Sequence, residues 1–347
     1  NSYIKGDNMS DLTNKIIELI KQNKSINEIC EITNLSNKQL FNIISIIGNS
    51  GYLFNKKYYY DGNISYNQIN SIQDILNNNV GIITTNDINH LNFILISDLH
   101  FGSKFERVDL MNIVYDYAIK NNINLIVIGG DLIDGTFGRE KKYCDTEKQI
   151  KHLLNDYPFD KNILSFAVLG DHDYSSLKEN GQDLSRILQS YRQDIIPLGY
   201  QFGEIRVKKD AFFVKHGFAN DFNDTGIRKN TTISNGLFLK GHTHDKLTVW
   251  STGGATIVSL PPLCDLNKSA IPSFSEMTMY FNTNRISNII IKQNIIMDSK
   301  VIEINEIRAQ IKANNNYYDS DLIEKNMSKT IRRKDTYTRK INSLEDL

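Results

Sequence analysis

Residues 124–135 read Asn-Leu-Ile-Val-Ile-Gly-Gly-Asp-Leu-Ile-Asp-Gly, an apolar run that ends at two glycines and two aspartates. Leu125–Ile128 is too short for a helix and rich in β-branched residues, so we predict a buried strand there. Asp131 then follows the carboxyl end of that strand. Ligands bind at this edge of an open α/β sheet because the loops from several strands meet there.

Four further apolar runs also stop at a carboxylate, an imidazole or both. They end at Asp98-Leu99-His100, Asp171-His172-Asp173, His216-Gly217 and His242-Thr243-His244. The chain has seven histidines, and five of them lie in these segments. Taken alone, an aspartate or histidine at a strand end is more often a cap or a satisfied polar group. The repeated pattern indicates instead that these strand ends share a function.

Length, net charge and cysteine content limit the classes of protein that this chain can belong to. A length of 347 residues is enough for two domains, one of them with a large core. The net charge is zero, so any affinity for nucleic acid has to come from a local patch. Three widely spaced cysteines argue against disulfides and give a thiolate metal site little support. No apolar run approaches the roughly 20 residues of a membrane span. We therefore expect a cytoplasmic protein without a membrane partner.

The pattern of elements predicts an α/β fold with two packed β-sheets flanked by helices, preceded by a small, mostly α-helical, winged-helix-like domain. Strand and helix patterns alternate from residue 93, which favours βαβ units and a largely parallel sheet. The β-rich segments 255–260, 276–281 and 286–296 predict a second sheet. The expected parts are a helix-turn-helix or winged-helix-like module at 9–66, a linker at 67–92, the α/β domain at 93–304 and a polar, partly basic tail at 305–347.

The amino-terminal module contains three short amphipathic helices. Capping boxes, Ser25 with Glu28 and Ser36 with Gln39, open the second and third helices. Residues 51–60 look like the first strand of a wing, so the module resembles a helix-turn-helix. The residues that would contact DNA are Lys38, Asn42, Ser45, Lys56 and Lys57. Because the module is close to neutral, a protein-contact or dimerisation role carries nearly equal weight.

The motifs occur in the order Asp-x-His, Gly-Asp-x-x-Asp, Gly-Asp-His-Asp, His-Gly and Gly-His-x-His. This set resembles the calcineurin-like metallophosphoesterases across residues 93–304 and implies their sandwich of two sheets between helices. The resemblance implies that one metal ion is bound by Asp98, His100 and His244, a second by Asp171, His216 and His242, and both by the bridging Asp131. Oxygen and nitrogen ligands suit Mn²⁺ best, with Fe or Zn²⁺ as alternatives.

The resemblance also implies catalytic roles. His172 would stand near the leaving-group oxygen as general acid or charge stabiliser, and Asp134 would accept its other N–H and fix the tautomer. The family carries asparagine where this chain has Asp171. The added negative charge is expected to tighten metal binding and to reduce Lewis acidity toward phosphate. Asp173 is interpreted as a cap of the following helix.

The expected substrate class rests on smaller differences between this chain and the protein phosphatases of the family. Protein phosphatases of the family carry an arginine soon after the second motif and a glutamate after Gly-Asn-His, whereas here glycine and threonine follow Asp134 and Asp173 follows His172. This favours phosphodiesters. Residues 98–102 resemble the opening motif of the family's double-strand-break repair nucleases. We therefore predict a DNA-directed nuclease or phosphodiesterase, with a homodimer or partner subunit left open. The alternatives are a phosphomonoesterase acting on protein or small molecules, and a catalytically weak DNA-tethered scaffold.

Overall fold

The computed structural model describes residues 6–22, 24–49, 53–59, 64–69, 80–83, 89–137, 140–217, 236–244, 246–252, 254–265 and 271–312. The predicted tail beyond 312 lies outside them. The helices are α1 Gly6–Lys21, α2 Ile26–Thr33, α3 Asn37–Asn49, α5 Val108–Lys120, α6 Thr146–Asp156, α7 Asp171–Asn180 and α8 Leu184–Tyr191. None of the helices in these ranges is both long and apolar enough to cross a membrane.

One sheet has the strand order β15-β14-β13-β4-β5-β6-β7. Its strands are β4 His90–Ile96, β5 Leu125–Ile128, β6 Leu164–Leu169, β7 Ile195–Tyr200, β13 Ser273–Asn282, β14 Arg285–Met297 and β15 Lys300–Gln310. Strands β4 to β7 are parallel, as the alternation of strands and helices predicted. Strands β13 to β15 add antiparallel neighbours on the β4 side.

The other sheet has the order β11-β12-β10-β9-β8-β3-β1-β2. Its strands are β1 Leu53–Tyr59, β2 Ile64–Ile69, β3 Val80–Ile83, β8 Phe202–Val207, β9 Asp210–His216, β10 Gly236–Gly241, β11 Thr248–Thr252 and β12 Ala255–Ser259. Of the three β-rich segments predicted for a second sheet, only the one containing β12 belongs here. Strands β13 and β14 join β4 instead, because an apolar pattern identifies a strand but not its partner.

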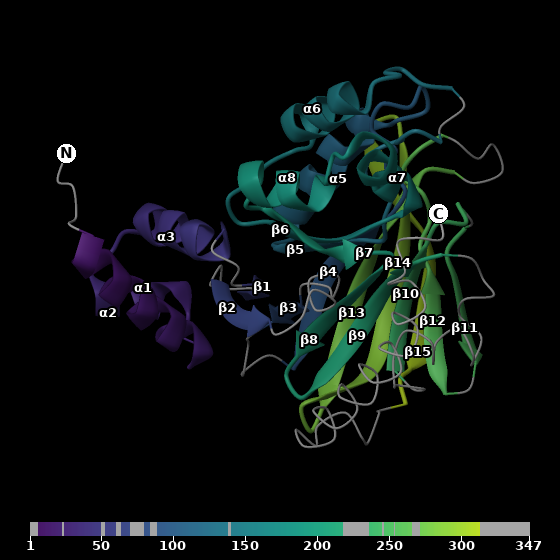
Figure 1. Ribbon diagram of the computed structural model, residues 1–347. Helices are drawn as coiled ribbons and strands as arrows, with labels where there is room; N and C mark the ends of the chain where they lie inside the picture. Colours follow the sequence, from purple (N-terminus) through teal and green to yellow (C-terminus); the bar gives the residue numbers. More distant parts are fainter. Residues whose placement is uncertain are drawn as a thin grey trace, which may run out of the picture.

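The two sheets pack face to face, with helices α5, α6 and α8 on the outer face of β4 to β7 (Figure 1). Phe93, Phe166 and Phe212 belong to the core between the sheets. Ile94 and Ile126 point the other way, into the core beneath the helices. Strands buried on both faces need continuous apolar runs, which is the pattern seen at residues 93–96 and 125–128. The predicted two-sheet architecture is confirmed.

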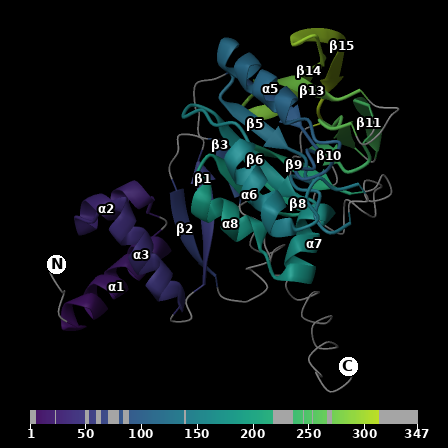
Figure 2. The same cartoon turned by 90° about the horizontal axis from the view of Figure 1, so that it is seen from above.

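The three amino-terminal helices have a core of their own, which includes Ile16, Ile29 and Leu40. The predicted capping box at the start of α2 is present: the backbone N–H of Ser25 donates to Glu28 Oε2 at 2.8 Å, and the Glu28 N–H donates to Ser25 Oγ at 3.3 Å. These helices stand beside the two-sheet body, with β1 and β2 next to them (Figure 2).

Two expected boundaries differ from the structure. Residues 80–83, expected in a linker, form β3, which pairs in parallel with β1 on one side and with β8 on the other. The hairpin of β1 and β2 is therefore part of the larger sheet. At the other end, β15 continues to Gln310, past the expected boundary at 304, because it pairs with β14 along its length.

Candidate metal centre

The predicted ligands lie at strand ends from both sheets. Asp98, Asp131 and Asp171 follow β4, β5 and β6 of one sheet, whereas His216 ends β9 and His242 follows β10 of the other. The loops after these strands meet at one edge of the sandwich, where hydrogen bonds join them. The backbone N–H of His242, for example, donates to Asp98 Oδ2 at 3.2 Å. Segments far apart in the sequence thus bring their polar side chains to one place.

One group of donor atoms belongs to Asp98, His100, Asp131 and His244, and these atoms lie within 4.8 Å of one another. His244 Nε2 is 3.1 Å from Asp98 Oδ1 and 3.1 Å from His100 Nε2. Asp98 and His100 are completely buried. Four donors from three different loops therefore converge on one buried point.

A second group belongs to Asp131, Asp171, His216 and His242, again within 4.8 Å of one another. His216 Nε2 lies 3.0 Å from Asp131 Oδ2 and 3.2 Å from Asp171 Oδ1. His242 Nδ1 lies 3.0 Å from Asp171 Oδ1. Asp131 belongs to both groups. The structure thus assembles the same two sets, with the same shared carboxylate, that the family resemblance implied.

The backbone at these residues is unusual. Five of the seven predicted ligands have positive φ angles: Asp98 at 54°, His100 at 47°, Asp131 at 52°, His242 at 90° and His244 at 52°. Residues other than glycine lose about 1–2 kcal/mol each in this left-handed region. Such conformations persist where the surrounding structure enforces them, and they cluster at functional sites.

Glycines allow the close approach of the ligands. The carbonyl oxygen of Gly129 accepts a hydrogen bond from His216 Nδ1 at 2.8 Å, so the hydrogen sits on Nδ1 and Nε2 faces the carboxylates. A Cβ atom at Gly130 would lie 2.6 Å from Cγ of His216. A Cβ atom at Gly170 would lie 2.7 Å from Cγ of Asp131. Neither position accepts a side chain without displacing a ligand.

Residues 91–262 match the sequence model of the calcineurin-like phosphoesterases. All seven predicted ligands lie within this span. The chain contains a calcineurin-like phosphoesterase domain. Phosphoesterases of this family are metal-dependent hydrolases, so the family and the hydrolase class that the motifs indicated are confirmed. The two donor groups are candidate ligands for the divalent ions that the family uses.

No curated protein sequence matches the chain. Among solved structures it is similar to Vps29 from Chaetomium thermophilum, with 10% identity over 64% of this chain and 100% of that one and a TM-score of 0.39. It is also similar to the nuclease MPE from Pseudomonas putida, with 11% identity over 61% and 87% of the two chains and a TM-score of 0.31. The calcineurin-like phosphoesterase YfkN from Bacillus subtilis is 11% identical over 72% and 99%, with a TM-score of 0.30.

The charges in the phosphoesterase domain suit cations. Burial acts to raise the pKa values of Asp98 and Asp171, but the surrounding histidines lower them more strongly, so both carboxylates are ionised. Burial lowers the pKa of His100, which keeps that imidazole neutral, the form that binds metal. For His216, burial also acts to lower the pKa, but Asp131 and the other nearby carboxylates raise it well above its ordinary value.

Buried polar atoms test whether metal ions fit. Within the described residues, Asp98 Oδ1 and Asp171 Oδ1 are buried without a hydrogen bond, although each lies beside an imidazole nitrogen. Leaving such groups unsatisfied is costly, and a cation between carboxylate and imidazole would satisfy them. The donor set therefore fits two divalent ions. Ions held there would supply Lewis-acid stabilisation of the negative charge on phosphoryl oxygens.

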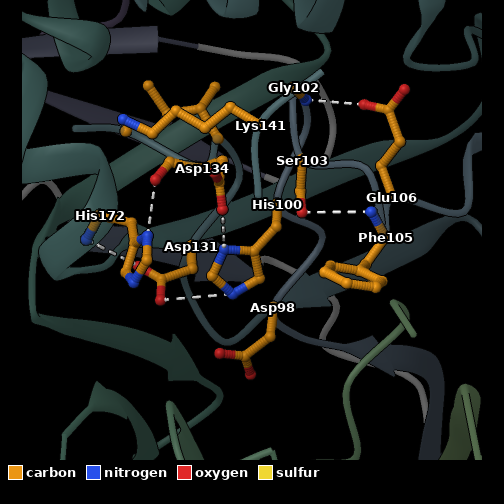
Figure 3. Close-up of polar contacts among 12 residues, drawn as sticks. Asp98, His100, Gly102, Ser103, Phe105, Glu106, Asp131, Asp134, Lys141 and His172 are labelled. Atoms are coloured by element: carbon orange, nitrogen blue, oxygen red, sulfur yellow. Dashed lines mark hydrogen bonds and ion pairs between the residues drawn. The ribbon is translucent and has the colours of Figure 1, made fainter. Parts of the chain in front are cut away.

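The structure shows which atoms of Asp134 face the two neighbouring imidazole rings (Figure 3). His172 Nδ1 donates to the backbone carbonyl oxygen of Asp134 at 2.7 Å, and not to its carboxylate. The carboxylate Oδ1 lies instead 3.5 Å from His100 Nδ1. Sequence spacing places the residue but does not tell which of its oxygens faces a ring. The acceptor of the His172 N–H is therefore the main chain of Asp134, while its carboxylate lies beside His100, one of the predicted ligands.

Asp173 does more than the predicted helix cap. Its buried carboxylate accepts the backbone N–H of Gly170, the cap of α7, at 2.8 Å. It also accepts the N–H groups of Leu132 at 3.1 Å and Ile133 at 2.9 Å. Burial and the charge of Asp131 raise the pKa of Asp173 to about 7. The carboxylate thus joins the loop after β5 to the loop after β6. Local sequence does not reveal this role, because two of the three N–H donors lie some forty residues earlier in the chain.

The predicted DNA contacts do not join the metal centre. Lys38 and Asn42 are exposed on α3, which also contains Ser45, while Lys56 and Lys57 belong to β1. The side chains of Ser45, Lys56 and Lys57 lie outside the described part of the structure. Strands β3 and β8 separate β1 from β9 in the sheet. The two predicted sites are therefore distinct surfaces of the chain.

Proposed function

We propose that the chain is a dinuclear-metal-dependent phosphodiesterase that acts on DNA, with Mn²⁺ as the expected ion. The observation that carries the proposal is the pair of donor groups that share Asp131, with a further imidazole at their edge. The ring of His172 packs edge-on against that of His100, with 4.7 Å between the centroids. Two cation positions and an adjacent acid are the groups that cleavage of a phosphate ester requires.

Asp131 and His172 would have different roles in the reaction. Asp131 holds both positions together: its Oδ2 lies 3.0 Å from His216 Nε2, and its Oδ1 accepts the backbone N–H of His172 at 3.1 Å. His172 keeps the hydrogen on Nδ1 because the Asp134 carbonyl can only accept. Its Nε2 is then the atom that would hold a proton for the leaving oxygen.

An exposed aromatic ring beside this acid supports a nucleic-acid substrate. Phe137 is 50% exposed, and its ring centroid lies 5.7 Å from that of His172. An exposed phenyl ring next to a phosphate site suits stacking with a base, which contributes about 1–3 kcal/mol per base. The glycine and threonine between Asp134 and Phe137 take the place of the arginine that marks protein phosphatases of the family. Both features favour a phosphodiester with a nucleoside attached.

The amino-terminal helices and the hairpin of β1 and β2 would bring the domain to DNA. Lys38 and Asn42 are one turn apart on the exposed side of α3, where they would reach a phosphate and a base edge. A surface for a partner protein or for a second copy of the chain is the alternative. Fluorescence anisotropy with labelled duplex DNA separates the two, since DNA binding predicts salt-dependent affinity that Lys38→Ala weakens.

Hydrolysis of bis(p-nitrophenyl) phosphate and p-nitrophenyl phosphate, with Mn²⁺ and with chelator, tests the catalytic proposal. We expect faster, metal-dependent cleavage of the diester, and its loss in Asp131→Ala and His172→Ala. Preference for the monoester would instead identify a phosphomonoesterase. If the metal-loaded protein is inactive on both substrates, the remaining alternative is a catalytically weak DNA-tethered scaffold. If diester cleavage is found, single- and double-stranded DNA are the next substrates to compare.

A further inference from the structure

Cys264 lies beside the metal centre although no sequence motif includes it. It follows β12, and its side chain is completely buried. Hydrogen bonds fix the backbone on both sides: the Leu263 N–H donates to the Ser97 carbonyl at 2.9 Å, and the Asp265 N–H donates to the Phe105 carbonyl at 2.9 Å. These carbonyls flank the loop between β4 and α5, which carries two of the ligands. The thiol is therefore held against that loop.

The thiol is close enough to share an ion with two histidines. Cys264 Sγ and ring nitrogens of His100 and His244 lie within 4.8 Å of one another. A tetrahedral zinc ion, with bonds of about 2.3 Å to sulfur and about 2.1 Å to nitrogen, holds those two donors roughly 3.6 Å apart. From separations of at most 4.8 Å, a movement of about 1.2 Å at most would bring the sulfur to such a distance from the ring nitrogens.

A second observation shows that this position calls for a cation. Asp98 Oδ1 is buried, lies 3.1 Å from His244 Nε2 and has no hydrogen bond within the described residues. The thiol thus adjoins a group of carboxylate and imidazole donors in which one buried carboxylate oxygen has no hydrogen bond. The other donor group, which contains Asp171 and His216, has oxygen and nitrogen donors and no sulfur among the described residues.

We propose that Cys264 is a further ligand of the metal position formed by Asp98, His100 and His244, and that it makes this position selective for a thiophilic ion such as Zn²⁺ over Mn²⁺. Thiolates select zinc, whereas carboxylates favour manganese. The thiol binds as the thiolate, and its proton passes to solvent. The position with Asp171 keeps the preference for harder ions, so the centre holds two different metals. The inference rests on the two-metal centre of the proposed function but not on its substrate.

Cobalt(II) reports the sulfur ligand directly, because a cobalt–thiolate bond absorbs in the near ultraviolet. The starting protein is the full-length variant Cys30→Ser/Cys144→Ser, in which Cys264 is the only thiol. We expect the charge-transfer band on loading this protein with Co²⁺, and its absence after the further change Cys264→Ser. We also expect Cys264→Ser to weaken Zn²⁺ binding by about 10-fold or more while Mn²⁺ binding changes little.

X-ray absorption at the zinc edge of the unmodified protein, loaded with one equivalent of Zn²⁺, needs no variant and covers the case in which Cys264→Ser fails to fold. A scattering shell at about 2.3 Å is expected for sulfur. Bound metal with neither a charge-transfer band nor a sulfur shell would overturn the role of Cys264 and leave the phosphodiesterase proposal intact. Protein that binds no metal at all would overturn both.

Discussion

Gly170→Ala tests whether the shared carboxylate depends on the glycine at the start of α7. Its backbone φ of −85° is ordinary for alanine, so the change adds no backbone strain. The new Cβ would lie 2.7 Å from Cγ and 2.8 Å from the backbone nitrogen of Asp131, whereas ordinary contacts begin at 3.4 Å. Rotation of the side chain cannot relieve the contact with the backbone nitrogen. The shared ligand therefore has to move by about 0.7 Å.

The displacement affects both metal positions, since Asp131 belongs to each donor group. A misplacement of about 1 Å can reduce activity by roughly 100-fold, and overpacking of a buried site costs about 1–3 kcal/mol of folding free energy. We expect Gly170→Ala to lose most of its metal content after dialysis against limiting Mn²⁺, measured by mass spectrometry of the bound metal. Thermal unfolding of the same samples shows how much of the protein stays folded.

Gly181→Ala is the matched control, at the other end of the same helix. Gly181 has a φ of +69°, and no atom lies within 4 Å of a Cβ built there. Alanine at this position costs about 1–2 kcal/mol through backbone strain alone. The control is expected to lose stability and keep its metal. If Gly170→Ala retains both ions with unchanged affinity, the steric argument for a fixed Asp131 is wrong.

Three further changes probe the centre. Asp134→Asn removes the charge beside His100 but keeps the backbone carbonyl that holds His172. Metal affinity measured by titration should therefore fall about 10- to 100-fold, while the alkaline limb of the pH–rate profile stays in place. Asp171→Asn should weaken metal binding and raise the rate at saturating Mn²⁺; tighter binding would contradict the charge argument. The pKa of His216 lies above its ordinary 6.5 in the metal-free protein, so its contribution to stability is complete below pH 6.5 and is lost as pH rises through the higher folded-state value. Urea unfolding across pH should show this loss, and His216→Ala should lack it.

The ligands could be predicted because strand and ligand are adjacent in sequence. A parallel strand buried on both faces has to be a continuous apolar run, and its end is where a polar side chain first reaches the site. Asp131 and His216 were found in this way. The predicted sheet strands β4 to β6 follow from the same pattern.

Other features depend on contacts that local sequence does not encode. The carboxylate and carbonyl of Asp134 face different rings, and spacing cannot distinguish them. Cys264 is far in sequence from the other cysteines, which argued against a thiolate site, yet its neighbours in the fold are histidines. Strand β3 has four residues and is recognisable only from its partners.

Strand β3 links the amino-terminal strands β1 and β2 to the rest of their sheet through its pairing with β8. In the parallel pair, Val80 lies opposite Glu204, so β3 cannot pair with β8 until much more of the chain has been made. At about 5–20 residues per second of synthesis, the wait is on the order of ten seconds. During that time the side of β3 that later pairs with β8 is an open edge, the kind of surface on which chains aggregate. Strand β3 is thus made long before the strand that covers it, and this chain is one for which early capture by a chaperone would matter.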